Sequence, residues 1–229
     1  DAAAAVRVSF VLVAIWWFVF MLPLSIHVRE RPGEAGVSLG MAMTAGVREL
    51  LGTMRDVARY RELALFLVAY WLYIDAVNTI IKMAVDYGVA LGLPTESLLA
   101  ALLMTQFIAF PAALAFGWLG ERIGAKRGIL IAIVIYTLAT LYAFFLDSVI
   151  EFFGLASVIG LVQGGIQSLS RSFFGRLVPA GKGGEFFGFY NMMGKFATVV
   201  GPLLVAVVAL ATGSSRASNA SLALLFVAG

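Results

Sequence analysis

The chain contains no cysteine, one histidine, six prolines and few charged residues, which make up 13% of its 229 residues. Because the chain has no cysteine, it cannot form disulfides or thiolate metal sites or carry out thiol redox chemistry. The histidine, His27, ends an apolar run and has no candidate partner close in sequence, so we interpret it as an interfacial residue. Soluble domains carry roughly 25% charged residues. The shortage of charge therefore argues against a soluble fold.

Apolar residues make up 62% of the chain, and the mean hydropathy is +0.98. Runs of about twenty apolar residues recur, and a helix needs about that many to cross a hydrocarbon core of about 30 Å. We predict an all-α membrane protein, a helical bundle with six complete spans and a truncated seventh. The spans are 8–28, 63–89, 97–119, 129–146, 150–170 and 186–211, and the seventh opens at residue 219.

Lysine and arginine gather in alternate loops. There are six in 29–62, none in 86–96, three in 120–128, none in 147–151 and three in 171–185. The net charge of +3 could suggest nucleic acid in a soluble protein, but this alternation is typical of a multi-pass membrane protein and we predict no nucleic-acid partner. By the positive-inside rule the three basic loops are cytoplasmic.

The long first loop, 29–62, has apolar residues at helical spacing with arginines and acids between them. This predicts an amphipathic helix that lies in the membrane interface, with a plain cytoplasmic linker helix as the alternative. The chain begins without Met or a signal-peptide pattern and ends in a short apolar segment. We therefore expect it to be an internal piece of a larger protein.

Polar residues occur at membrane depth in four spans. In the span 63–89, Asp75 lies about 18 Å and Asn78 about 22 Å from the cytoplasmic end, and Lys82 and Asp86 lie further out. Their spacing places all four on one stripe of the helix, which should face protein or water. We interpret the first two as functional and the last two as part of the rim.

Three other spans also carry polar groups, whereas 8–28 and 129–146 hold no charged or amide group in their interiors. An ammonium at mid-depth costs about 2.5–3.5 kcal/mol, which makes Lys195 the strongest candidate. The predicted substrate-binding or coupling residues are Asp75, Asn78, Gln106, Gln163, Gln167, Asn191 and Lys195. The alternatives are that Asp75 and Lys195 form a buried ion pair and that the amides join helices.

The residues show no enzymatic constellation. There is no phosphate-binding GxxxxGK[ST] loop, no metal cluster and no Ser/His/Asp set, so we predict neither an enzyme nor a cofactor or metal. Pro202 predicts a kink in the span 186–211. Secondary transport is the class that remains.

The loop "GWLGERIGAKRGIL", residues 117–130, resembles the signature loop of the major facilitator superfamily. Positions that match are Gly117, Leu119, Gly120, Arg122, Gly124 and Lys126. Glu121 replaces the usual aspartate and Ala125 the first basic residue, which weakens the charge relay. The resemblance implies a gating loop that uses Gly117, Glu121, Arg122, Gly124 and Lys126.

The same resemblance implies the C-terminal half of a twelve-helix transporter. Residues 1–28 would be the last helix of the N-terminal half, 29–62 the central cytoplasmic linker and 63–229 the truncated C-terminal bundle. The four spans with polar interiors would then be those that line the central cavity of this half. The N-terminal half of the same polypeptide, the lipid bilayer and a small-molecule substrate are the implied partners.

Four stretches narrow the resemblance to the autophagy-related vacuole effluxer family and its bacterial permease relatives. They are "AYWLYIDAVNTI", "TQFIAFPAALAFGWLGERIGAKR", "GLVQGGIQSLSRSFFGRLVP" and "GEFFGFYNMMGKFATVVGPLL". The fungal members are associated with amino-acid export from the vacuole. The Ala- and Arg-rich composition favours a bacterial plasma membrane over a vacuole.

The resulting prediction is a secondary active transporter that moves a small polar solute, with amino acids as the hypothesis, by alternating access. In this hypothesis Asp75 binds a cationic group or carries a coupling proton, and Lys195 faces an anionic group. The alternative is a non-transporting membrane scaffold or sensor on a transporter fold. A channel fits less well because the polar groups cluster at mid-depth and form no continuous charged ring.

Overall fold

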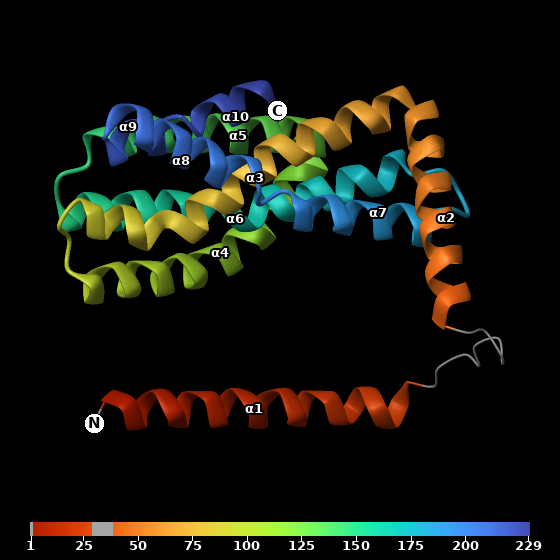
Figure 1. The fold of residues 1–229 in the computed structure, drawn as a ribbon, viewed down its shortest axis with the longest axis horizontal. Coiled ribbons are helices and arrows are strands. Elements are labelled where there is room, and N and C mark those ends of the chain that lie inside the picture. Colours follow the sequence, from red (N-terminus) through yellow and green to blue (C-terminus); the bar gives the residue numbers. More distant parts are fainter. Residues whose placement is uncertain (1, 29–38) are drawn as a thin grey trace. The chain divides into compact units, whose positions relative to one another are not determined.

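The structure is a computed structural model that describes residues 2–28 and 39–229, in two units, 1–47 and 48–229. The first unit holds α1 (Ala2–His27), drawn in red in Figure 1. Its large apolar side chains are exposed along the whole helix, including Trp16 and Trp17. An apolar surface on every side suits a helix that contacts lipid or another segment. Residues 29–38, the start of the predicted linker, lie outside the described residues.

The second unit is a helical bundle, and the described residues contain no strand. Its members are α3 (Arg61–Ala90), α4 (Thr95–Ile123), α5 (Ala125–Tyr142), η1 (Ala143–Phe145), α6 (Val149–Leu177), α7 (Gly183–Phe196), α8 (Val200–Thr212), α9 (Ser215–Ala220) and α10 (Ala223–Ala228). In the described part of the chain, six helical segments are long and apolar enough to cross a membrane. This confirms the predicted number of spans and the all-α class.

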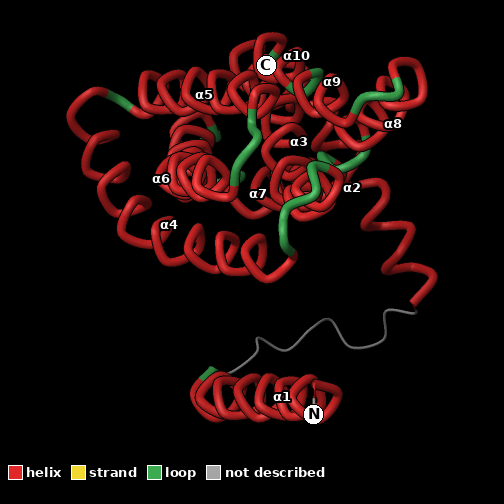
Figure 2. Tube along the Cα trace, turned by 90° about the vertical axis from the view of Figure 1, so that its left-hand side faces the viewer, coloured by secondary structure: helices red, strands yellow, loops and turns green. Residues whose placement is uncertain are grey.

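The helix α6 is central to the packing, with α4 and α5 on opposite sides of it (Figures 1 and 2). On the other side of the bundle α3 contacts α6, α7, α8 and α10. The middle of α3 is its most buried part, since Tyr73, Asp75, Ala76 and Val77 are each at most 1% exposed. The polar stripe predicted on this helix therefore lies partly inside the bundle.

Glycines on α6 bring α4 unusually close. A Cβ on Gly164 would lie 2.6 Å from the carbonyl oxygen of Ala109 and 2.8 Å from the Cβ of Ala113. One turn earlier, a Cβ on Gly160 would lie 3.0 Å from the carbonyl oxygen of Thr105. Small residues four apart let membrane helices pack backbone to backbone, which explains the long α4–α6 contact.

The helix α2 (Leu39–Arg59), within the predicted linker, begins in the first unit and continues into the second. In the second unit it buries Thr53 and Val57, and Asp56 forms an ion pair with Lys182, which precedes α7. The hydrogen bond from Lys182 lowers the pKa of the Asp56 carboxyl and raises the pKa of the lysine. The structure has a helix within the predicted linker, whereas the role of this segment as a linker and its place in the membrane interface stay predictions.

The last complete span is broken. The helix α7 ends at Phe196 and α8 begins at Val200, and we call residues 197–199 the helix break. The kink predicted from Pro202 is confirmed as this break, because a proline opposes a helix that continues through the carbonyl four residues before it, here that of Thr198. Pro202 itself lies in the first turn of α8, where a helix tolerates proline. Figure 1 shows α7 and α8 following one another along the bundle with α3 beside the break.

Candidate functional site

A polar cavity of about 650 Å³ opens between α3, α6 and α7. Each helix contributes residues about one turn apart, so that one face of each points to the same space. The lining residues are Tyr70, Ile74, Asn78, Gly164, Gln167, Ser168, Arg171, Tyr190, Asn191, Gly194 and Lys195. Four of the seven predicted binding residues meet here: Asn78, Gln167, Asn191 and Lys195.

The surface of this cavity carries positive charge, and we call it the cationic cavity. Arg171 and Lys195 both line it, and among the described residues no Asp or Glu does so. Neither cation forms an ion pair with another described residue. Two cations that face a partly enclosed space, with amide groups beside them, can bind a carboxylate or phosphate through charge-assisted hydrogen bonds.

Aromatic rings form the wall behind these cations. The rings of Tyr70 and Tyr190 stack with their centroids 4.4 Å apart, and the guanidinium of Arg171 lies 5.5 Å from the ring centroid of Phe187. The tyrosines and Arg171 were missing from the predicted site. Aromatic residues within a span usually belong to the core, and Arg171 opens a predicted basic loop, 171–185, so only the tertiary contacts identify them.

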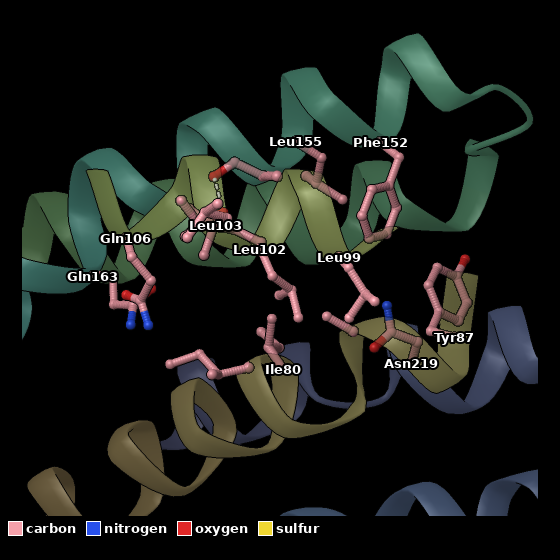
Figure 3. Close-up of a pocket in the computed structure, with 15 residues that line it drawn as sticks. Ile80, Tyr87, Leu99, Leu102, Leu103, Gln106, Phe152, Leu155, Gln163 and Asn219 are labelled. Atoms are coloured by element: carbon pink, nitrogen blue, oxygen red, sulfur yellow. Dashed lines mark hydrogen bonds between the residues drawn. The ribbon is translucent and has the colours of Figure 1, made fainter. Parts of the chain in front are cut away.

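Gln106 and Gln163 lie elsewhere, in a largely apolar cavity of about 370 Å³ between α3, α4, α6 and α9. Figure 3 shows the two amide groups next to each other at one end of this cavity, with Tyr87 and Asn219 at the other end. The Gln163 Oε1 atom is buried and has no hydrogen-bond partner among the described residues. The structure therefore separates these two predicted residues from the cationic cavity.

Asp75 lines neither of these two cavities. The residue is only 1% exposed, and its Oδ2 atom accepts a hydrogen bond of 2.9 Å from the backbone N–H of Val200. Three residues later, Asn78 Nδ2 donates a bond of 2.9 Å to the carbonyl oxygen of Ala197. The structure thus places Asp75 against the helix break, and it does not bring Asp75 and Lys195 together as an ion pair.

The predicted gating loop is the tight connection between α4 and α5. Gly124 joins the two helices with a φ of 88°, a left-handed conformation that favours glycine. The guanidinium of Arg122 lies 3.8 Å from the centroid of the Trp118 ring. Within the described part of the chain, Glu121, Arg122 and Lys126 form no ion pair. Gating by Gly117, Glu121, Arg122, Gly124 and Lys126 therefore stays a prediction.

Comparison with known proteins decides the family. A family model described as "Vacuole effluxer Atg22 like" matches residues 1–229. The chain belongs to the Atg22-like vacuole effluxer family. Its similarity to a Bacillus subtilis protein, the uncharacterized MFS-type transporter YxiO, is 43% identity over 100% of this chain and 53% of the relative. The chain is therefore half of a major facilitator fold.

Fungal members of the Atg22-like family are more distant. Autophagy-related protein 22-2 of Aspergillus oryzae is 30% identical over 92% of this chain and 39% of its own length, and the Aspergillus clavatus protein of that name is 27% identical over 96% and 40%. The chain thus spans about half the length, or less, of these relatives. As a member of this family it is an integral, multi-pass membrane protein and not an enzyme.

Among the described residues, no group of three or more His, Asp or Glu side chains could hold a metal ion. The polar groups that meet in the cationic cavity are amides, hydroxyls, a guanidinium and an ammonium. These groups bind and release polar solutes through hydrogen bonds and charge. The cationic cavity is therefore the candidate site for an Atg22-like transporter.

Proposed function

We propose that the whole protein is a secondary transporter that moves a small polar solute with an anionic group by alternating access. The observation that carries this proposal is the pair Arg171 and Lys195, which face one cavity without an acidic partner among the described residues. In transporters built from repeated halves, the substrate site lies near the bilayer midplane between them. The cavity would be this half's contribution, and an N-terminal half would supply the rest.

Amino acids are the first substrate class to test. Their carboxylate suits Arg171 and Lys195, and Gln167 and Asn191 supply both hydrogen-bond donors and acceptors to the remaining polar groups. Asn78, whose Nδ2 donates to Ala197, adds its Oδ1 as an acceptor. The fungal relatives belong to a family described as vacuole effluxers, which supports export of a small solute. For this chain we propose the bacterial plasma membrane, because a relative with 43% identity is bacterial.

We also propose how the chain divides into domains, on the basis of its match to about half of the bacterial relative. The exposed apolar surface of α1 fits the last helix of an N-terminal half, and α2 fits the central linker. With the basic loops on the cytoplasmic side, α3 would enter the bilayer from the cytoplasm. Labelling of single cysteines placed in the connections before α4 and after α6 would test this orientation, with opposite accessibility expected.

The function is tested by solute counterflow with the full-length protein in proteoliposomes. A screen of amino acids and other small carboxylates should yield saturable exchange, and Lys195→Met should raise the half-saturating concentration by about tenfold or more, because a charge-assisted hydrogen bond contributes about 1.5–3 kcal/mol. Lys82→Met is the matched control, since Lys82 is exposed on α3 and lines neither cavity described above.

A second pair of variants checks Arg171. Arg171→Gln should weaken exchange, whereas Arg176→Gln, on the same helix but outside the cavity lining, should not. Equal half-saturating concentrations for the wild type and Lys195→Met would contradict the assigned site. Absence of exchange for every solute class would favour the alternative, a scaffold or sensor on a transporter fold.

A further inference from the structure

The break between α7 and α8 leaves backbone N–H and C=O groups that need hydrogen-bond partners. Each helix end leaves up to four backbone groups without an intrahelical partner, and such groups are costly inside a membrane. Ala197 is fully buried, so its carbonyl oxygen cannot rely on bulk water. Pro202 removes one of the donors at the start of α8, because proline has no N–H.

The helix α3 supplies partners of the required polarity on both sides of the break. Asp75 Oδ2 accepts from the N–H of Val200, the first residue of α8, and Asn78 Nδ2 donates to the carbonyl oxygen of Ala197, just past the end of α7. Both bonds are 2.9 Å long. A carboxylate also interacts favourably with the positive end of the α8 dipole.

The fit around these bonds is tight. Thr79 Oγ1 donates a hydrogen bond of 3.4 Å to the second oxygen of Asp75, Oδ1. A Cβ on Gly201 would overlap Thr79 Oγ1 and would lie 2.9 Å from Asp75 Oδ1. Only a glycine lets the first turn of α8 come this close to α3.

We propose that Asp75 and Asn78 are positioning residues that fix the helix break and thereby the direction of the last turn of α7. That turn carries Lys195, which immediately precedes Phe196, the last residue of α7, and faces the cationic cavity. Asp75 then acts on transport through Lys195 without contacting the solute. The positioning itself is independent of the proposed function, and only its consequence for exchange rests on that function.

The test uses the full-length protein in proteoliposomes, with any cysteine outside this chain replaced. Spin labels at Gly188→Cys on α7 and Leu210→Cys on α8 report the distance across the break. A Cβ at Gly188 would meet nothing within 4 Å, and Leu210 is 88% exposed, so neither label should disturb the packing. Asp75→Ala should shift or broaden this distance distribution, because the Val200 N–H loses its acceptor.

The conservative variant separates positioning from proton or cation binding. Asp75→Asn keeps an acceptor oxygen and should retain the wild-type distance and exchange within about fivefold, whereas Asp75→Ala should lower exchange by about tenfold or more, as expected for a lost hydrogen bond to a charged group. If Asp75→Asn is as inactive as Asp75→Ala while the distance between its spin labels is unchanged, the proposal is overturned. Asp75 would then be a group that carries a coupling proton or cation.

Asn78→Ala is the second variant if Asp75→Ala fails to fold, and it should also shift the distance distribution. An unchanged distribution in Asn78→Ala and in every folded Asp75 variant would overturn the proposal whatever happens to exchange. If wild type shows no exchange while the distance shifts as expected, the positioning stands and the proposed transport function fails. The two results are therefore distinguishable.

Discussion

Replacing Gly164 with alanine should destabilise the bundle, although alanine is normally the better helix former. The added Cβ would lie 2.6 Å from the carbonyl oxygen of Ala109 and 2.8 Å from the Cβ of Ala113, and these atoms sit on or next to the α4 backbone. They cannot rotate away, so α4 has to move as a whole.

The magnitude follows from two opposing effects. Overpacking costs about 1–3 kcal/mol, and the gain from replacing a helical glycine is about 0.5–1 kcal/mol. Because two contacts are too short at once and one is to a backbone oxygen, we expect the upper part of the first range. The net loss of stability should be about 1–2 kcal/mol.

Gly154→Ala is the matched control on the same helix, since a Cβ there would meet nothing within 4 Å. Thermal unfolding of the detergent-solubilised full-length protein should give a lower midpoint for Gly164→Ala, and an unchanged or higher midpoint for Gly154→Ala. Adding Ala113→Gly to Gly164→Ala should recover part of the loss. Equal midpoints for the two single variants would refute the close α4–α6 packing.

Two further predictions concern stability and charge. Gln163→Leu should leave the unfolding midpoint unchanged or raise it, because it removes a buried oxygen without a partner among the described residues; a midpoint lowered by more than the Gly164→Ala effect would contradict this. For Asp56, whose pKa lies below the ordinary 3.8, the ion pair with Lys182 stabilises the docked α2 above that ordinary value and is lost as the pH falls through the lowered pKa. An NMR titration of labelled aspartate should therefore show the Asp56 midpoint rising toward the ordinary value in Lys182→Met, and an unchanged midpoint would argue against the pair.

Of the four spans that the sequence predicts to line a central cavity, those that hold α3, α6 and α7 line the cationic cavity and α4 does not. The prediction succeeds this far because a polar side chain in an apolar span is costly when it faces lipid. Counting depth along straight helices was enough to find Asn78, Gln167, Asn191 and Lys195, which do share a cavity. The same count could not show that Gln106 and Gln163 face a different, apolar cavity. Depth is a single coordinate, and the rotation of each helix about its axis comes from packing.

Pro202 was a local signal for the helix break, but the partners of the break could not be read from the sequence. Residues 197–199 read Ala-Thr-Val, with no glycine or proline of their own, and the disruption comes from Pro202, which opposes a helical hydrogen bond to the carbonyl of Thr198. The partners that make the break tolerable, Asp75 and Asn78, lie more than a hundred residues earlier in the chain. A carboxylate that satisfies a distant backbone N–H has the same sequence pattern as one that binds a solute, so only the tertiary structure separates the two readings.

The most direct test of the cationic cavity is charge selectivity in counterflow. For the best solute from the screen, exchange of the carboxylate is compared with exchange of its amide, in the wild type, Lys195→Met and Lys82→Met. We predict that the wild type and Lys82→Met prefer the carboxylate by about tenfold or more and that Lys195→Met loses most of this preference. An undiminished preference in Lys195→Met would contradict the assignment of this cavity as the anion-binding site.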